Sequence, residues 1–275
     1  MHFKIVNGEK TLDISEISCH YCKTCESALH CKRNFDLIFH HADFKRGDLL
    51  GIFDIMGPVM VGPSSSHTAG AVRIGYITRK LLGEKPVKAE LLLHGSFAAT
   101  GKGHGTDKAL TAGLLGMKPD DERIPHSFEL AANEGMSVKV GTVTLRNVHP
   151  NTVLLHVEGL KGRKLEVEAS SVGGGQIKIC QIDGIETNFS GECPTLVVHN
   201  IDKPGHVAEA TSLLAKYHVN IATMQLYRNV RGGYAVMVIE CDQPVPPEPL
   251  QQLSQMDGIL KVTYLNMDTE VAEKR

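Results

Sequence analysis

The chain has 275 residues, enough for two ordinary domains, and its 42% hydrophobic and 22% charged residues are typical of a soluble globular protein rather than a disordered chain. Because 29 Lys and Arg nearly balance 31 Asp and Glu, the net charge of -2 argues against nucleic acid or an anionic membrane as a partner and favours small molecules or proteins. We predict a cytoplasmic protein, since the first residues lack the apolar core of a secretory signal and no later run approaches the roughly 20 apolar residues of a membrane span.

Residues 1–47 differ in composition from the rest, being rich in Cys, His and Lys without a sustained apolar period. Four of the seven cysteines gather in this segment: Cys19, Cys22, Cys25 and Cys31. Such closely spaced thiols could hold zinc or an iron–sulfur centre. Ferredoxin-type runs place the last cysteine sooner and follow it with Pro, which this segment does not. A disordered N-terminal extension is therefore the favoured alternative.

The segment from Leu49 is apolar and broken by Gly and Pro, which predicts a loop that enters a helix near Ser66. The helix is predicted from apolar residues at near-helical spacing: Ala71, Ile74, Ile77, Leu81 and Leu82. A strand over Ala89–His94, a Gly-rich turn and a helix around Asp107–Leu115 should follow. The runs SVKVGTVTLRN, TVLLHVEG and KLEVEAS then alternate like antiparallel strands with one exposed face. Together these elements predict one α+β domain over residues 48–190.

The last part of the chain, residues 194–275, is predicted to be a second domain. Its expected elements are a strand TLVVHNI, a helix His206–Tyr217, strands Ile221–Tyr227 and Tyr234–Glu240, a helix near Leu250–Met256 and a strand Ile259–Tyr264. The order βαββαβ describes a ferredoxin-like unit.

Several long motifs occur in order along the chain: GPVMVGPSSSHTAGAVRIG from Gly57, GKGHGTDKALTAGLLG from Gly101, HPNT from His149 and SVGGGQI from Ser171. Together they resemble the substrate-binding domain of bacterial iron–sulfur L-serine dehydratases, and the resemblance extends over residues 50–275. It implies the smaller, β-type subunit of a lyase (L-serine ammonia-lyase) that converts L-serine to pyruvate and ammonia.

The Ser64–Thr68 segment suits an amino-acid carboxylate, because it offers four hydroxyls at a helix N-terminus, whose free N–H groups and dipole favour an anion. The same dipole would keep His67 neutral and able to accept a proton. With the resemblance, His67, Ser66 and Thr68 are the candidate catalytic residues, and Ser64 and Ser65 the candidate substrate-binding residues. The alternative is that Ser66 is only an N-cap and His67 an exposed polar residue.

The second glycine-rich segment carries three further candidates for substrate binding: Lys102, His104 and Thr106. Its glycines would let the backbone approach a ligand ahead of a helix. A tight strand-to-helix turn capped by Thr106 or Asp107 explains the same residues equally well. The glycines of SVGGGQI are open to a similar explanation, as a bulge or bend in a strand.

The loop between the first strand and helix of the second domain resembles the effector loop of ACT domains. The candidate effector-binding residues are Asp202, Pro204, Gly205 and His206. ACT domains usually dimerise and bind amino acids at the interface, so the resemblance implies regulation by serine. A dimerisation role without a ligand is the alternative.

Elimination from serine requires a base at the α-carbon and a Lewis acid on the poor leaving group. In the resembled family a [4Fe-4S] cluster supplies the Lewis acid, and in its two-subunit members the cluster cysteines lie on a separate α chain. No pyridoxal-phosphate lysine signature is evident. Two other functions stay open: a serine-sensing regulatory module like those of some phosphoglycerate dehydrogenases, and a metal or redox interaction protein centred on the N-terminal cysteines.

Overall fold

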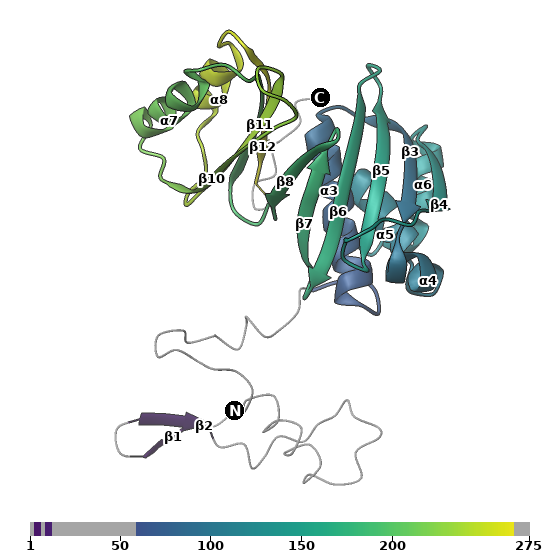
Figure 1. The fold of residues 1–275 in the computed structure, drawn as a ribbon. Helices are drawn as coiled ribbons and strands as arrows, with labels where there is room; N and C mark the ends of the chain where they lie inside the picture. The colour runs from purple at the N-terminus through teal and green to yellow at the C-terminus, as the bar shows by residue number, and fades with distance from the viewer. Residues whose placement is uncertain (1–2, 7–8, 13–58, 267–275) are drawn as a thin grey trace. The chain divides into compact units, whose positions relative to one another are not determined.

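A computed structural model describes residues 3–6, 9–12 and 59–266 (Figure 1). The chain divides into two compact units, Met1–Ile55 and Met56–Arg275. In the first, β1 (Phe3–Val6) pairs antiparallel with β2 (Glu9–Leu12). The four cysteines of the predicted metal site lie outside the described residues.

The second unit begins with a six-stranded sheet in the order β4-β3-β5-β6-β7-β8. Its strands are β3 (Pro86–Leu93), β4 (Ser137–Thr142), β5 (Thr152–Gly159), β6 (Lys164–Gly173), β7 (Gln176–Ile182) and β8 (Ile185–Phe189). All neighbours are antiparallel except β3 and β4, which run parallel. The β6–β7 turn shows why SVGGGQI needs glycine: Gly174 and Gly175 both have positive φ, as a two-residue type I′ hairpin requires.

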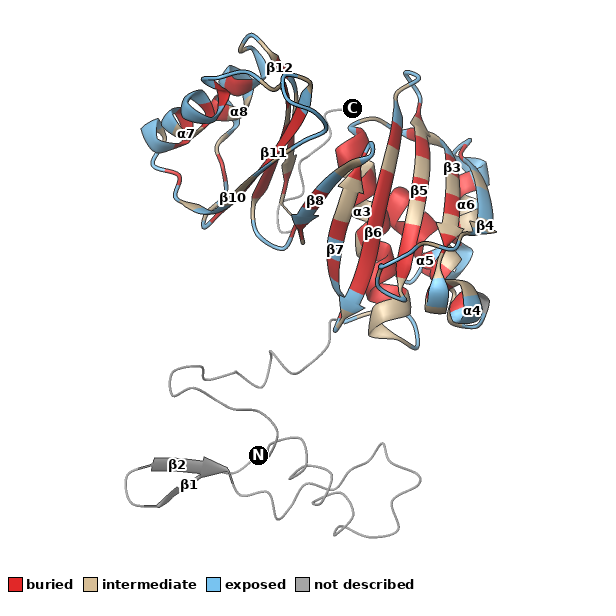
Figure 2. Ribbon diagram, in the orientation of Figure 1, coloured by how far each residue is buried: buried red, intermediate tan, exposed pale blue. Residues whose placement is uncertain are grey.

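Helices cover one face of this sheet (Figure 1). They are η1 (Ser65–Gly70, a π-helical turn), α3 (Ala71–Leu82), α4 (Gly95–His104), α5 (Thr106–Leu114), η2 (Ile124–His126) and α6 (Ser127–Asn133). The alternation along β3 buries Ala89, Leu91 and Leu93 against the helices, and the red bands of Figure 2 show the same two-residue period on the neighbouring strand β5. None of the described helices is long and apolar enough to cross a membrane.

Two glycines let α3 and α5 touch through their backbones. A Cβ at Gly75 would lie 2.2 Å from the Leu110 carbonyl oxygen, and one at Gly113 would lie 2.1 Å from that of Val72. Any side chain at either position would push the helices apart. This contact holds α3, and η1 at its start, in place.

The ACT-like part has the predicted order of elements. They are β9 (Thr195–Ile201), α7 (His206–Lys216), β10 (Ile221–Arg228), β11 (Tyr234–Cys241), α8 (Pro247–Ser254) and β12 (Ile259–Leu265). The sheet order β10-β11-β9-β12, antiparallel throughout, is that of a ferredoxin-like fold, which confirms the predicted α+β fold class. One face packs on α7 and α8. The other places Val197 and Val236 in the hydrophobic cluster of the first sheet and α3.

Two local predictions were wrong. The expected Gly-rich turn after β3 is largely the helix α4, because Phe97 is fully buried beneath it and Gly105, at φ 69°, ends it. The strand β4 is parallel to β3 rather than antiparallel, since α4, α5 and α6 form a crossover that returns the chain to the same edge. Periodicity alone shows which face of a strand is buried but not its direction.

Candidate active site

The turn η1 places His67 at the start of a continuous helical segment. Ser64 is the N-cap: its Oγ accepts from the backbone N–H of His67 at 3.2 Å. The N-cap is therefore Ser64 and not Ser66, as the alternative interpretation had it. Gly70 keeps helical φ and ψ, so η1 passes directly into α3. Single π-helical turns of this kind occur frequently at functional sites.

The imidazole of His67 contacts hydroxyl groups at both ring nitrogens. Nε2 lies 3.0 Å from Thr100 Oγ1 and 3.2 Å from Ser96 Oγ, and Nδ1 lies 3.3 Å from Ser64 Oγ. The Thr100 hydroxyl donates its proton to the Ser96 carbonyl at 2.8 Å, so it accepts from Nε2–H. The tautomer that follows carries its proton on Nε2 and leaves Nδ1, facing Ser64, as the basic nitrogen.

The surroundings of His67 favour the neutral imidazole. Burial, followed by the charge of His104, lowers the pKa of His67 below its usual 6.5, while the Ser96 backbone acts in the opposite direction. The ring centroids of His67 and His104 are 5.1 Å apart, and Phe97 packs edge-on against His67 at 5.3 Å. His67 is therefore held in place and unprotonated at neutral pH, as a proton acceptor must be.

The structure brings together only some of the predicted site residues. Two of them, Ser64 and His104, lie against the ring of His67. Ser65 and Ser66 are half-buried in the same turn. Thr68 and Thr106, at 2% and 0% exposure, have buried hydroxyls without a partner among the described residues. Their side chains face the interior. Lys102 lies in α4, but its side chain is not among those that the structure describes.

The motifs HPNT and SVGGGQI converge on this turn. The Pro150 carbonyl accepts from the N–H of Ser96 at 2.8 Å, which fixes the start of α4. The N–H of Ser171 donates to the Asn151 carbonyl at 2.9 Å. A Cβ at Gly70 would lie 2.2 Å from Ser171 Oγ, so β6 packs directly against η1. Residues more than 80 positions apart in the sequence thus meet around His67.

Sequence reasoning missed Ser96 and Thr100. Both belong to α4, in the stretch that was expected to be a turn, where they sit four residues apart. The i, i+4 spacing puts them on one helix face, and assigning that helix would have been the signal needed to find them.

The predicted effector loop is partly committed to internal contacts. The Asp202 carboxylate accepts from the N–H of Gly232 at 2.9 Å and pairs with Arg228 at 3.2 Å; the first contact chiefly holds the pKa of Asp202 below its usual value. His206 is 7% exposed, and its Nδ1 lies 3.2 Å from Glu209 Oε2. Pro204 and Gly205 face solvent.

The residues in the described part of the chain do not fit a metal cluster. They contain no group of three His, Cys, Asp or Glu side chains that could hold an ion. The described cysteines are all free: Cys180 lies on β7, Cys193 between β8 and β9, and Cys241 on β11.

The comparisons with known proteins match both parts of the second unit. The serine dehydratase beta chain family matches residues 51–136, and the ACT domain family matches residues 195–258. A probable L-serine dehydratase beta chain of Bacillus subtilis is 44% identical over 78% of this chain and 97% of its own length. The L-serine dehydratase beta chain of Peptoniphilus asaccharolyticus is 41% identical over 70% and 87%. A D-3-phosphoglycerate dehydrogenase of Methanocaldococcus jannaschii is 26% identical over 72% of this chain but only 37% of its own length.

The protein therefore belongs to a class in which two domains are joined. The first is an α+β domain with a histidine at a helix start whose ring nitrogens contact hydroxyl groups, and the second is an ACT domain. The chain belongs to the serine dehydratase beta chain family and carries an ACT domain at its C-terminus, which confirms the predicted resemblance.

Proposed function

We propose that this chain is the β subunit of a cytoplasmic L-serine ammonia-lyase that forms pyruvate and ammonia. The observation that carries the proposal is the neutral His67, held by hydroxyls at both nitrogens at the start of a helix, in a chain 44% identical to a probable dehydratase beta chain. The domain limits 48–190 and 194–275, with an N-terminal extension 1–47, remain a prediction.

In this proposal the chain binds serine and holds the base. The start of η1, continuous with α3, presents the positive end of the helix dipole and the hydroxyls of Ser65 and Ser66 to the substrate carboxylate. His67 accepts the α-proton at Nδ1, where the Ser64 hydroxyl now lies at 3.3 Å. Thr100 accepts from Nε2–H throughout and so stabilises the imidazolium as it forms.

The cofactor is proposed to be a [4Fe-4S] cluster bound by a partner α chain, without pyridoxal phosphate. This division of labour rests on the beta-chain relatives and on the poor fit of the described residues to a cluster. The ACT domain is proposed to mediate homodimerisation and to bind serine through its exposed Pro204–Gly205 turn.

The N-terminal cysteines are not needed under this proposal. We expect that deleting residues 1–47 leaves both the iron content and the rate of the two-chain enzyme largely unchanged, because every element around His67 begins after residue 58. Iron analysis and pyruvate formation with full-length and shortened chains check this. A matched loss of iron and rate would instead place a working centre on Cys19, Cys22, Cys25 and Cys31.

The double variant Ser96→Ala/Thr100→Val distinguishes an active-site subunit from a regulatory module. If His67 is the base, removing its Nε2 partners should lower kcat by roughly tenfold or more with little change in KM, because the ring loses its orientation. A regulatory module would change the serine dependence and leave the maximal rate as it was.

The matched control is Thr211→Val in α7. The hydroxyl of Thr211 donates to the carbonyl of Val207 four residues earlier, just as that of Thr100 donates to Ser96. It therefore reproduces the loss of an i−4 helix contact away from His67. An equal fall in kcat for both variants would show that the effect is structural and would contradict the assigned role.

A further inference from the structure

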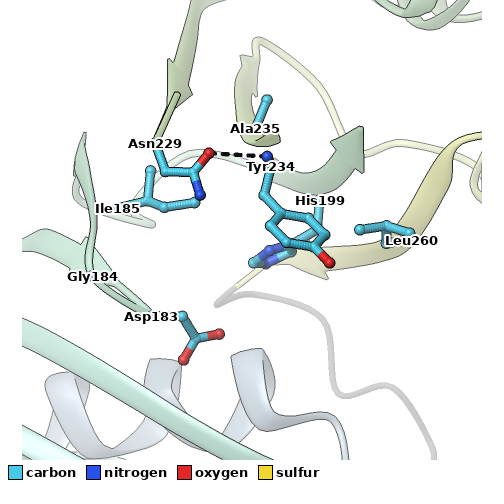
Figure 3. Close-up of a pocket in the computed structure, with 8 residues that line it drawn as sticks. All are labelled: Asp183, Gly184, Ile185, His199, Asn229, Tyr234, Ala235 and Leu260. Atoms are coloured by element: carbon cyan, nitrogen blue, oxygen red, sulfur yellow. Dashed lines mark hydrogen bonds between the residues drawn. The ribbon is translucent and has the colours of Figure 1, made fainter. Parts of the chain in front are cut away.

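A pocket of about 280 Å³, lined by both polar and apolar side chains, lies between the β7–β8 turn and the sheet of the ACT domain (Figure 3). Asp183 and Gly184 line one side, and His199, Tyr234 and Leu260 line the other. A single water needs only about 10–15 Å³ of such space, so the pocket has room for a molecule the size of a small amino acid.

The acidic side of the pocket is rigidly built. Asp183 and Gly184 form a two-residue hairpin turn with φ 49° and 76°, the type I′ geometry typical of an Asp-Gly pair. The Asp183 Oδ1 accepts from the N–H of Glu166 at 2.8 Å, and the Asp183 N–H donates to the Glu166 carbonyl at 2.9 Å. These contacts fix the carboxylate at the pocket edge, and no described cation lies within ion-pair distance of it.

The opposite side offers hydrogen-bond donors that are not used within the described chain. Asn229 Oδ1 accepts from the N–H groups of Val230 and Tyr234, which orients the amide and leaves its Nδ2 without a partner among the described residues. The ring of Tyr234 is 60% exposed beside it. His199 is held neutral, because burial and then the charge of Arg163 lower its pKa, although Asp183 acts in the opposite direction. Arg163 interacts electrostatically with both His199 and Asp183, so its positive charge lies near both sides of the pocket.

We infer that this pocket binds an α-amino acid as its zwitterion, with the ammonium group at Asp183 and the carboxylate at the Asn229 amide and the Tyr234 hydroxyl. A fixed carboxylate and a set of unused donors that line the same pocket complement separated charges of both signs. The apolar side chains of Ile185 and Leu260 leave room for a short side chain. This site is distinct from the turn around His67, and the Asp202–His206 loop contacts the β10–β11 turn beside it through Asp202.

The pocket lies close to a direct contact between the ACT domain and α3. Lys261 of β12, which is paired with His199 of β9, donates to the carbonyls of Leu81 and Leu82, the second at 3.1 Å. These carbonyls end α3, whose other end joins η1. The helix of 12 residues spans about 18 Å, so one rigid element connects this part of the sheet with His67.

Because the chain contains no tryptophan, a single introduced tryptophan can report on the pocket by its fluorescence. In the full-length Leu260→Trp variant, L-alanine should change the emission with saturation, whereas propionate and ethylamine, each lacking one of the two charges, should not at the same concentration. L-alanine is the probe because it has no hydroxyl to eliminate. Val230→Trp, at an exposed position next to Asn229, provides a second reporter, and a flat response of both reporters overturns the inference.

Two charge variants then test the assigned groups. Asp183→Asn keeps the acceptor for Glu166 and tolerates positive φ, yet it should weaken L-alanine binding by roughly tenfold or more. Asn229→Asp keeps both backbone contacts of Oδ1 and should weaken binding by repelling the carboxylate. Asp121→Asn, the matched control outside the pocket, likewise keeps the acceptor for a backbone N–H, that of Arg123, and should leave the midpoint unchanged. Loss of binding in the control alone, or unchanged binding in both pocket variants, overturns the inference.

Discussion

Pyruvate is expected to form from L-serine only when this chain is combined with a partner chain that carries the cluster ligands. Under the proposed function, the described residues provide the base and the helix start for the substrate carboxylate, but they hold no ligand set for a Lewis acid at the serine hydroxyl. Hydroxide is a poor leaving group, and a base alone cannot drive the elimination. The isolated chain should therefore form pyruvate no faster than serine does in buffer without protein.

The measurement is anaerobic mixing of the separately purified chains, with pyruvate and ammonia followed together. Both products should appear in equal amounts, only in the mixture, and exposure to air should abolish the rate because an open iron site is vulnerable to oxygen. Each chain alone is the control. Substantial, oxygen-insensitive pyruvate formation by this chain alone would overturn both the subunit assignment and the division of chemistry.

The substitution His67→Ala should lower turnover of the two-chain enzyme by roughly a hundredfold or more, as loss of a general base does. The fold should survive, since the ring is only half-buried and its partners are hydroxyls and an aromatic edge. Activity and Tm measured together check this. His67→Gln keeps a polar side chain without a base and should stay equally slow; recovery of the rate in this variant would remove His67 from the chemistry.

The pH dependence gives an independent test of His67. Because burial and His104 lower its pKa below 6.5, kcat/KM should rise with pH through a midpoint below that value and then level off. In His104→Asn the midpoint should move to higher pH, since the repulsion from a charged neighbour is gone. An unchanged midpoint would show that the group that titrates is not His67.

The sequence was sufficient for the order of elements in the ACT domain. Its strands are short apolar runs such as TLVVHNI and YAVMVIEC, and its helices begin and end at Gly, Pro or polar residues, as at Gly205 and Pro247. The serine-rich turn was also found correctly, because a cluster of hydroxyls before an apolar helix indicates a helix N-terminus. Local signals of this kind depend on neighbouring residues and can be read without the fold.

Only the tertiary structure decided what surrounds His67. Thr100 and Ser96 reach its ring because Phe97 buries the glycine-rich stretch as a helix, and Ser171 reaches Gly70 because β6 crosses beneath η1. The same motifs predict Thr68 and Thr106 as site residues, yet the hydroxyls of both are buried in the core. The sequence by itself determined the residue types and the helix start, whereas long-range packing decided which side chains face the base, because contacts between distant residues leave no local pattern.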